Sequence, residues 1–235
     1  MKEKIWIIIP ALNEEKTIGK IIREIHNVCK NRFPCYEIIV LNDGSTDMTK
    51  PEAIKAGATV LEHPVNFGKG KSITDSWFWI MNRQKLNLSD IIIHFDADGQ
   101  HNPSFIPKFV EELNKYNMVI GKRDLRNYPF YKKFGNKYLS WIASIFSGQD
   151  IKDSECGFRC FRVDTMIDLY KYINAIGYEI EIETNIVAGL LGCRIAFIEI
   201  PSVYRKGIGL LSGIKNGYYA VKIWLKMRLG WLKWK

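Results

Sequence analysis

The segment IWIIIPALNEEKTIGKIIREIHNVC, residues 5–29, decides the fold class of this 235-residue chain. Its first part, Ile5–Ile9, is an unbroken apolar run ended by Pro10, which is typical of a β-strand buried on both faces. From Ile18 to Cys29 the apolar residues recur mainly three or four positions apart, the period of an amphipathic helix. The segment therefore predicts a buried strand followed by a helix, the repeating unit of an α/β protein.

The same alternation continues toward the C-terminus. Further strands are predicted at residues 36–41, 58–61, 91–95, 118–121, 157–162 and 194–199. Helices are predicted at residues 17–29, 46–56, 71–83, 103–116, 133–147, 164–172 and 183–191. Elements alternating at this spacing form a mostly parallel central sheet flanked by helices. No internal repeat or linker interrupts the pattern, so we expect one domain over residues 1–211 and an extension over residues 212–235.

The positive charge of the chain lies almost entirely at its C-terminal end. The formal net charge is +9, and residues 201–235 carry eight basic residues and no acidic ones. Residues 1–200 carry 26 basic and 25 acidic residues. A nearly neutral body argues against a surface that binds nucleic acid, so we expect no nucleic-acid partner.

Residues 212–235 interleave lysines with tyrosines and tryptophans, which predicts a helix lying in the headgroup region of a membrane. The alternatives are a terminal helix packed on the domain with a solvated basic face and, less favoured, a segment that binds nucleic acid. Residues 138–147 are either a second interfacial helix or part of the core, and the core is favoured.

No stretch of the sequence predicts a membrane span. The longest uncharged candidate, Tyr138–Gln149, falls short of the roughly 18 to 20 apolar residues that a span requires. The five cysteines include no CxxC pair, which favours a reducing compartment. We therefore expect a cytoplasmic protein, peripheral on the cytosolic face of a membrane.

Three polar clusters follow predicted strands, at residues 10–15, 42–47 and 96–101. In an open α/β sheet the ligand binds beyond the carboxyl ends of the strands, so these clusters should converge. Asp96 and Asp98 point the same way from an extended backbone, and paired carboxylates suit Mg²⁺ or Mn²⁺ completed by substrate phosphates. The alternative is an Asp-rich turn that caps the next helix.

Two further segments have both a structural and a functional interpretation. Asp43 precedes a helix cap formed by Ser45, Thr46 or Asp47, and it is therefore available to a nucleobase or ribose. The glycine-rich turn NFGKGK, residues 66–71, opens a helix and could hold phosphate through main-chain N–H groups and two lysines. Either segment could instead serve only to end a strand and begin a helix.

Eight motifs occur in order across nearly 200 residues. They are IIIPALNEE (7–15), LNDGSTDMT (41–49), NFGKGKS (66–72), FDADGQHNP (95–103), GKRD (121–124), DSECGFRCFR (153–162), GYEIEIET (177–184) and IEIPSVYRKGIG (198–209). Together they resemble the family 2 glycosyltransferases of the GT-A fold. The resemblance is strongest to the polyprenyl-phosphate glycosyltransferases of the dolichyl-phosphate mannose synthase type.

The resemblance implies a role for each matching position. The nucleoside of a sugar nucleotide would be held by Pro10, Ala11, Asn13, Glu14 and Asp43, with Lys69 close to it. The divalent metal, Mg²⁺ or Mn²⁺, and the diphosphate would be bound by Asp96, Asp98 and Gln100. The diphosphate or the acceptor phosphate would be contacted by Arg123, Lys132, Lys133 and Arg205. The catalytic residues would be Asp96, Asp98 and Arg123. Arg159 matches a further family position and would bind substrate, and two other family positions are matched by Glu181 and Glu183.

Three positions depart from the family pattern. Asn42 stands where the family usually has a second aspartate, which leaves the preferred nucleobase open. Lys132-Lys133 replaces a segment often opened by arginine, and lysine lacks the bidentate guanidinium fork. Leu210–Gly213 replaces the usual serine-lysine pair after the last basic motif.

The implied activity is metal-dependent, inverting transfer of a hexose from a nucleotide sugar of the GDP-mannose or UDP-glucose type. The implied acceptor is a polyprenyl or dolichyl phosphate, whose oxygen is already anionic near neutral pH and needs no strong base. One alternative keeps the fold but uses a saccharide hydroxyl as acceptor. An alternative of another class is a non-catalytic, membrane-associated binding module.

Overall fold

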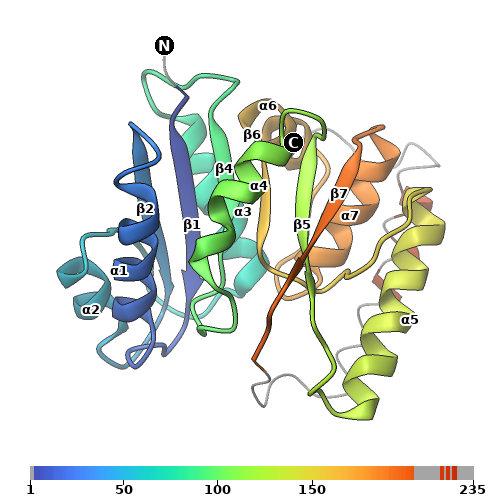
Figure 1. Ribbon diagram of the computed structural model, residues 1–235, viewed down its shortest axis with the longest axis horizontal. Coiled ribbons are helices and arrows are strands. Elements are labelled where there is room, and N and C mark those ends of the chain that lie inside the picture. The colour runs from blue at the N-terminus through green and yellow to red at the C-terminus, as the bar shows by residue number, and fades with distance from the viewer. Residues whose placement is uncertain (1–2, 204–217, 220, 223, 227–235) are drawn as a thin grey trace.

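A computed structural model describes residues 3–203, 218–219, 221–222 and 224–226 of the chain. Its centre is a seven-stranded sheet in the order β3-β2-β1-β4-β6-β5-β7 (Figure 1). The first half of the sheet is parallel throughout and consists of β1 (Ile5–Ala11), β2 (Tyr36–Asp43), β3 (Thr59–His63) and β4 (Ile91–His94). These strands correspond to the predicted ones. Because they run parallel, their carboxyl ends lie at the same edge of the sheet.

The second half of the sheet contains the departure from parallel order. It consists of β5 (Met118–Arg123), β6 (Arg159–Arg162) and β7 (Ile195–Ile200). Strand β6 runs antiparallel to both β4 and β5, whereas β7 is parallel to β5. The predicted mostly parallel sheet is confirmed, and β6 brings the loop before it to the same edge as the ends of β4 and β5.

Helices cover both faces of the sheet. They are α1 (Ile18–Cys29), α2 (Thr49–Lys55), α3 (Lys69–Met81), α4 (Ile106–Glu112), α5 (Phe130–Ser147), α6 (Val163–Tyr170) and α7 (Ile180–Leu190). A short 3-10 turn, η1 (Pro103–Phe105), precedes α4. In Figure 1, α1 and α4 lie in front of the sheet and α3, α6 and α7 lie behind it. Helix α5 packs along α7 at the right-hand edge of the view in Figure 1, beyond β5 and β7.

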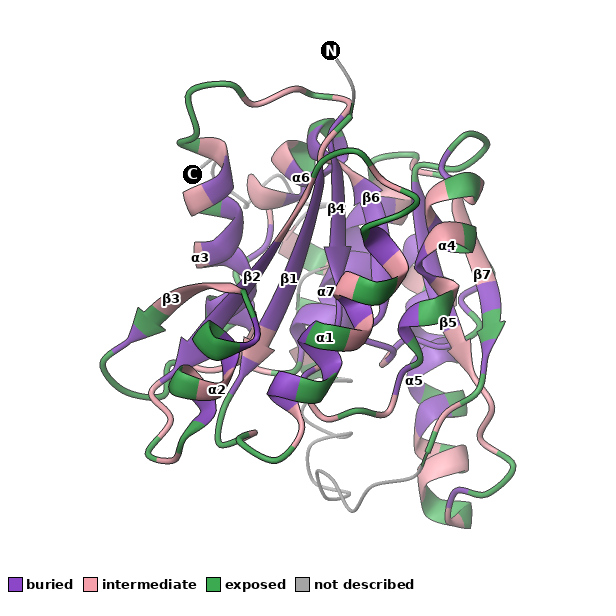
Figure 2. Ribbon diagram, turned by 60° about the vertical axis from the view of Figure 1, so that its left-hand side comes forward, coloured by how far each residue is buried: buried purple, intermediate pink, exposed green. Residues whose placement is uncertain are grey.

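The core lies between the sheet and these helices. The strand runs Ile5–Ile9, Ile38–Leu41, Ile91–Ile93 and Met118–Ile120 are buried along their whole length, as Figure 2 shows in purple. Burial on both faces explains why these strands read as unbroken apolar runs and not as alternating ones. At about 25 cal/mol per Å² of apolar area removed from water, this core is the main stabilising contribution to the fold.

The helices differ from their predicted limits by a few residues, and in α3 and α7 the difference affects the residues of the site. Helix α3 begins at Lys69, which places Gly70 inside the helix and not in the turn before it. Helix α7 begins at Ile180, so Glu181 and Glu183 belong to its first turn. Helix α5 includes residues 138–147, whose favoured placement in the core is confirmed for the buried face with Leu139, Ile142 and Ala143. It is wrong for the exposed side chains of Tyr138, Trp141 and Ile145.

The predicted C-terminal extension falls mostly outside the described residues. Its described residues at 218–219, 221–222 and 224–226 are helical. Tyr219 packs partly buried against the core, and the Trp224 ring lies 5.3 Å from the ring of Phe146. In the part of the chain that the structure describes, no helix has the length and apolar character to cross a membrane.

Candidate active site

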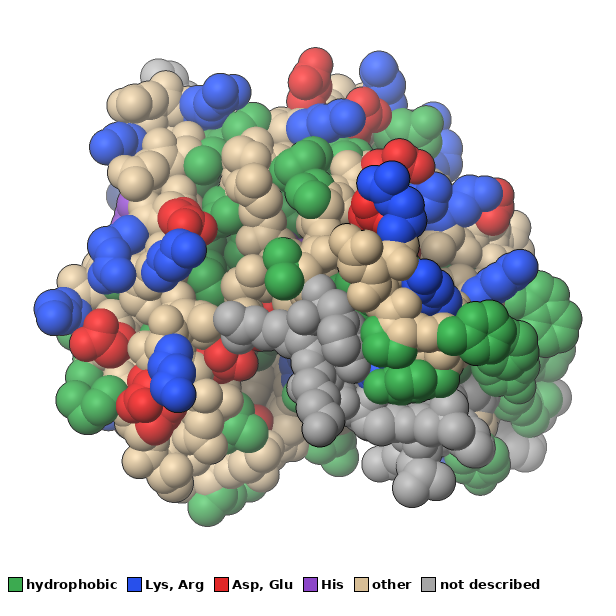
Figure 3. Space-filling model, turned by 60° about the horizontal axis from the view of Figure 1, so that its bottom comes forward, with side chains coloured by type: hydrophobic (Ala, Val, Ile, Leu, Met, Phe, Trp, Pro, Cys, Tyr) green, Lys and Arg blue, Asp and Glu red, His purple; other side chains and the backbone are tan. Residues whose placement is uncertain are grey.

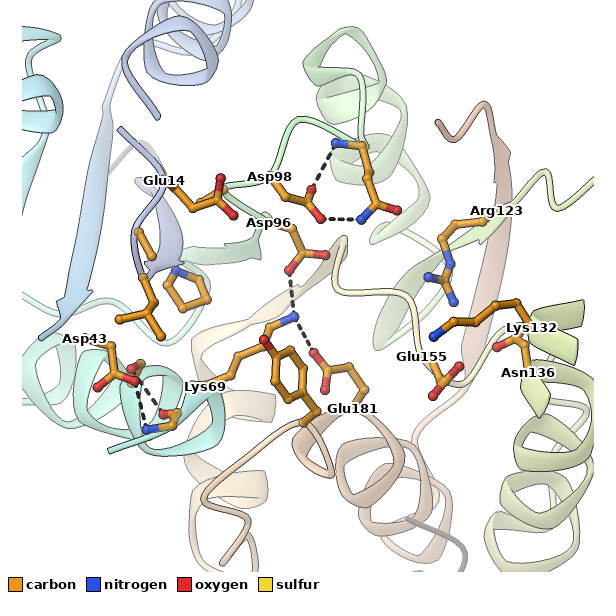
Figure 4. Close-up of a pocket in the computed structure, with 18 of the residues that line it drawn as sticks. Glu14, Asp43, Lys69, Asp96, Asp98, Arg123, Lys132, Asn136, Glu155 and Glu181 are labelled. Carbon is orange, nitrogen blue, oxygen red and sulfur yellow. Dashed lines mark hydrogen bonds and ion pairs between the residues drawn. The ribbon is translucent and has the colours of Figure 1, made fainter. Parts of the chain in front are cut away.

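A cavity of about 350 Å³ lies at the carboxyl ends of β1, β2, β4 and β5. Side chains reach it from both halves of the sheet and from helices α3, α5 and α7 (Figure 4). It is lined by Pro10, Ala11, Leu12, Glu14, Asp43, Asn66, Gly68, Lys69, Ser72, Asp96, Ala97, Asp98, Gln100, Arg123, Leu125, Tyr128, Lys132, Asn136, Glu155, Tyr178 and Glu181. The three predicted clusters therefore meet in one place, as the parallel order of β1, β2 and β4 requires.

A buried lysine joins two carboxylates at the floor of the cavity. Lys69 Nζ lies 2.6 Å from Asp96 Oδ1 and 2.6 Å from Glu181 Oε1. Burial alone would lower the pKa of Lys69, but these two carboxylates raise it well above its ordinary value. Burial likewise opposes ionisation of Asp96, yet Lys69 and His101 hold its pKa well below the usual range. Asp96 is therefore an anion fixed in position by two neighbours.

Asp98 and Gln100 form the adjoining oxygen-rich part of the cavity. The Asp98 carboxylate accepts hydrogen bonds from both the main-chain N–H and the side-chain amide of Gln100. The hydroxyl of Tyr128 donates to Gln100 Oε1 at 3.1 Å. Within the described residues, no lysine, arginine or histidine pairs with Asp98, although Lys69 pairs with Asp96. Among the described residues, no positively charged side chain therefore occupies the position next to Asp98 where a cation could bind.

The donor set fits a divalent cation that is completed by a phosphate ligand. The described residues hold no group of three or more His, Cys, Asp or Glu side chains arranged as a metal cage. Asp98 and Asp96 offer hard carboxylate oxygens, and Gln100 adds an amide oxygen. Mg²⁺ and Mn²⁺ accept few protein oxygens when water and substrate phosphates supply the others. The residues present therefore suit a cation that arrives with a phosphorylated substrate.

Asp43 holds the glycine-rich turn beside the cavity. Its carboxylate accepts hydrogen bonds from the main-chain N–H groups of Phe67 and Gly68, at 2.9 and 2.8 Å. His63 Nδ1 lies 2.7 Å from the same carboxylate, and His63 Nε2 lies 3.0 Å from Asp75 Oδ2. The N–H groups of Phe67 and Gly68 are thus occupied by Asp43, and that of Lys71 by Ile176 O, so these three do not form the predicted phosphate cradle.

Two glycines let this turn and the start of α3 approach a neighbouring loop. Gly68 has a φ of +98°, and a Cβ there would lie 2.6 Å from Ile176 O. A Cβ on Gly70 would lie 2.5 Å from Ala175 O. The spacing of the two glycines around Lys69 therefore serves close packing, which sends the Lys69 side chain between Asp96 and Glu181.

Arg123, Glu155, Lys132 and Asn136 line the opposite side of the cavity (Figure 4). Arg123 forms a bidentate pair with buried Asp153, with Nε–Oδ2 at 2.8 Å and Nη2–Oδ1 at 2.9 Å. This pair overcomes burial and raises the pKa of Arg123. Burial raises the pKa of Glu155, although Arg123 opposes that shift. This side of the cavity thus carries the positively charged Arg123, held in place by Asp153, and the carboxyl group of Glu155, whose pKa is raised.

Asn136 adds an unsatisfied polar atom to this side. Its side chain is buried, and Oδ1 has no hydrogen-bond partner among the described residues. Burying an amide oxygen without a partner costs about 1–3 kcal/mol, so such atoms at a cavity wall are satisfied by a ligand or by water. Asn136 is therefore placed to contact whatever fills this side of the cavity.

The model of the family "Glycosyl transferase family 2" matches residues 6–166, which is more than half of the chain. The chain belongs to glycosyl transferase family 2. An uncharacterized protein of Methanocaldococcus jannaschii is 31% identical over 91% of this chain and 89% of its own length. The UDP-N-acetylglucosamine–dolichyl-phosphate N-acetylglucosaminyltransferase of Methanococcus voltae is 28% identical over 91% of this chain and 93% of its own length.

A further relative and a solved structure are also similar to this chain. The undecaprenyl-phosphate mannosyltransferase of Micrococcus luteus is 27% identical over 89% of this chain and 88% of its own length. The glucosyl-3-phosphoglycerate synthase of Mycobacterium tuberculosis, solved with Mn²⁺, uridine diphosphate and glucosyl-3-phosphoglycerate, superposes with a TM-score of 0.73 at 22% identity. That match covers 97% of this chain and 80% of the synthase. The structural likeness confirms the predicted GT-A-like α/β fold.

Most of the residues predicted from the family 2 resemblance line the cavity. They are Pro10, Ala11, Glu14, Asp43, Lys69, Asp96, Asp98, Gln100, Arg123 and Lys132. Asn13 does not line it: with a φ of 55°, it accepts a hydrogen bond from the main-chain N–H of Thr46. Lys133 also lies outside the lining, and its Nζ donates to Arg126 O. Arg205 lies outside the described residues.

The structure corrects the predicted substrate contact of Arg159. Its side chain is 2% exposed and does not line the cavity. The guanidinium donates to the main-chain carbonyls of Ser154, Cys156 and Glu181, and to Asn185 Oδ1. A buried guanidinium requires such acceptors, so Arg159 ties the loop before β6 to α7 and acts on the site through that loop.

Several side chains that line this family 2 site were not predicted from the sequence, and three of them contribute polar groups beside the predicted residues. Glu155 stands within the quoted DSECGFR motif, Asn136 lies four residues after Lys132 on α5, and Tyr128 reaches Gln100 from the loop before α5. Helical spacing from Lys132 was the available signal for Asn136, because residues four apart share a helix face. Neither Glu155 nor Tyr128 carries a pattern that separates it from an ordinary loop residue.

Proposed function

We propose that the protein transfers a sugar from a nucleotide sugar to a polyprenyl phosphate. The observation that carries the proposal is the division of one cavity into two sides of different chemistry. The carboxylates Asp96 and Asp98 lie on one side, and Arg123 and Lys132 lie on the other. The names of the relatives from Methanococcus voltae and Micrococcus luteus, both polyprenyl-phosphate sugar transferases, support the choice of acceptor.

The nucleotide sugar is proposed to bind along the ends of β1, β2 and β4. Pro10, Ala11 and Glu14 lie where the nucleoside would contact the loop after β1. Asp98, Asp96 and Gln100 would hold Mg²⁺ or Mn²⁺ together with the diphosphate. The cation would stabilise the charge that develops on the departing nucleoside diphosphate. The Mn²⁺ and uridine diphosphate in a solved structure of the same fold support this placement.

The acceptor phosphate is proposed to bind on the opposite side. Arg123 is locked in orientation by Asp153, so it needs little reordering to meet an anion. Lys132 and Asn136 lie one helical turn apart on α5 and face the same cavity. The acceptor oxygen would attack the anomeric carbon opposite the leaving diphosphate, which inverts the configuration. Lys69 acts indirectly, since it keeps Asp96 ionised and in place.

Calorimetry of nucleotide binding tests the donor and cation parts of this proposal separately from turnover. UDP and GDP, each titrated with and without Mn²⁺, should bind more tightly with the cation in the wild-type protein. In Asp98→Asn the affinity gained from the cation should fall at least about tenfold, while cation-independent binding is kept. Lys132→Ala should leave both values unchanged. Equal cation dependence in Asp98→Asn would remove Asp98 from the proposed metal site.

A second candidate function uses a saccharide hydroxyl as acceptor. Glu155 is the observation that favours it, because a carboxyl group with a raised pKa in the cavity is suited to accept a proton from a hydroxyl. Transfer to free sugars that is abolished in Glu155→Gln would support this candidate. Transfer to polyprenyl phosphate that persists in Glu155→Gln would support the first one.

The protein is further proposed to work peripherally on the cytosolic face of a membrane. The basic, aromatic and acid-free sequence of residues 212–235 supports this placement. The relatives named for lipid-linked acceptors also support it, since such acceptors are anchored in a membrane. The division into a catalytic domain at 1–211 and a membrane-binding segment at 212–235 is part of the same proposal.

A further inference from the structure

Helix α5 carries an exposed aromatic stripe that no contact within the described chain explains. The stripe consists of Phe130, Phe134, Tyr138, Trp141 and Ile145, which recur every three or four residues and so share one face of the helix. Phe130 is 82% exposed, Phe134 is 64% and Trp141 is 60%. Figure 3 shows hydrophobic side chains gathered at the side of the molecule where α5 lies.

The rest of α5 holds this stripe rigidly in place. On the opposite face Leu139, Ile142 and Ala143 are buried, and the helix packs along α7. The rings within the stripe also support one another, with Phe130 and Phe134 stacked at 6.5 Å between centroids. The stripe therefore belongs to a helix that is packed on the core, and a contiguous exposed apolar patch of this kind marks an interaction site.

The charge around the stripe indicates the chemistry of that partner. Helix α5 contains Lys132, Lys133 and Lys137 and no acidic residue. The helical residues described near the C-terminus also meet α5, through the contact of Trp224 with Phe146, and they belong to a stretch of 35 residues without an acidic side chain. Aromatic side chains flanked by lysines are the composition of helices that lie in an anionic lipid headgroup layer.

We propose that the stripe of α5 docks the protein on an anionic phospholipid surface, with the five stripe side chains inserted at the level of the headgroups. The same helix lines the cavity through Lys132 and Asn136. Docking through α5 would therefore bring the cation-lined side of the cavity to the membrane that holds a lipid phosphate. This orientation rests on the proposed function, whereas binding to the lipid surface itself does not.

Flotation of the full-length protein with vesicles tests the docking surface. The vesicles contain either phosphatidylcholine alone or a mixture with phosphatidylglycerol. The stripe variant Phe134→Ser/Trp141→Ser is compared with Phe78→Ser/Leu88→Ser, which changes exposed apolar residues away from α5. The wild type and the control should float with the anionic vesicles. The stripe variant should bind them at least about tenfold more weakly, since two inserted apolar side chains are lost.

Two results would overturn the proposal. In one, the stripe variant floats with the anionic vesicles as well as the wild type does. In the other, the wild type fails to float with the anionic vesicles. If the wild type is then a dimer by light scattering and the stripe variant a monomer, a second copy of the chain covers the stripe. Transfer to a water-soluble, short-chain polyprenyl phosphate separates docking from catalysis. The stripe variant should retain that activity, whereas absence of transfer in the wild type contradicts only the proposed function.

Discussion

Asp96 is surrounded by groups that fix both its charge and its position. Lys69 Nζ contacts one carboxylate oxygen and His101 Nε2 the other, at 2.6 and 3.2 Å. The backbone of Gly157 also comes so close that a Cβ there would lie 2.3 Å from the carboxylate. Position 157, in the CGFR motif, therefore has to be a glycine, because any larger residue would collide with the carboxylate of Asp96.

Gly157→Ala is expected to displace the Asp96 carboxylate. The variant should lower cation-dependent nucleotide affinity at least about tenfold and reduce the free energy of unfolding by roughly 1–3 kcal/mol, the usual cost of overpacking. Gly135→Ala is the matched control, because a Cβ at that position in α5 meets nothing within 4 Å. Calorimetry and denaturant unfolding measure the two effects. Equal behaviour of the two alanine variants would contradict the role of Gly157.

Glu155 gives a pH-dependent prediction. Burial raises its pKa in the folded protein above the unfolded value. Below the unfolded pKa both states are protonated and there is no penalty. As the pH rises, the unfolded chain ionises first, so the folded state loses stability until the folded pKa is passed. Glu155→Gln should therefore raise Tm relative to wild type at pH 8 and leave it nearly unchanged at pH 4.

Glu111→Gln, at an exposed position of α4, is the control for this measurement. Its Tm difference from wild type should vary little between pH 4 and pH 8. A Glu155→Gln difference that is flat across the same range, or that falls as the pH rises, would show that the Glu155 carboxyl is not penalised by burial.

At the scale of single residues, chemistry was easier to predict than position. Asp96 and Asp98 could be predicted because paired carboxylates directly after a buried strand suit a metal ion. Lys69 was predicted from the glycine-rich turn and Arg123 from the resemblance of its motif to family 2. Arg159 stands in a motif as suggestive as theirs, yet its charge is satisfied by carbonyls inside the protein. The hydrogen-bond acceptors around a side chain are set by the tertiary packing of segments that are distant in the sequence. A sequence motif alone does not reveal them.

At the scale of elements, the Asn66–Gly68 turn is held by contacts from β2 and β3. Asp43 ends β2 and binds the turn's N–H groups, and His63 ends β3 and joins Asp43 to Asp75 on α3. The parallel register of the two strands places Asp43 directly beside His63. The two strand ends and the helix start therefore act as one unit that positions Lys69.

His63→Ala should loosen this turn. Loss of a buried hydrogen-bond partner is expected to cost about 1–3 kcal/mol and to speed hydrogen exchange at the amides of Phe67 and Gly68. His26→Ala is the control, since His26 contacts Tyr36 Oη away from the cavity. Exchange measured by mass spectrometry over residues 64–72 reports the effect. Unchanged exchange there in His63→Ala would contradict the role assigned to His63.

The same scale shows why helix limits were the weakest sequence predictions. The sequence suggests that Gly68 and Gly70 both belong to a turn, but Gly70 lies inside α3. It is a glycine because a side chain there would collide with Ala175 O, a contact that the sequence does not reveal. The antiparallel direction of β6 was equally hidden, since its residues are buried like those of a parallel strand. The strands β1, β2, β4 and β5 were predictable because burial on both faces of the sheet leaves an unbroken apolar run in the sequence.

At the scale of the whole molecule, the two halves of the sheet contribute different sides of one cavity. The parallel half brings Asp43, Asp96 and Asp98, and the half that contains β6 brings Arg123 and the loop with Glu155. Helix α5 closes the second side and exposes its aromatic stripe outward.

The most direct test of the central claim is transfer of a labelled sugar to a short polyprenyl phosphate. UDP-glucose, UDP-N-acetylglucosamine and GDP-mannose are offered as donors to the wild type and to Asp98→Asn, with Mg²⁺ or Mn²⁺ present. One donor should give a labelled lipid product, and Asp98→Asn should lower its kcat at least about 100-fold. No lipid product from any donor, or an equal rate in Asp98→Asn, would contradict the claim.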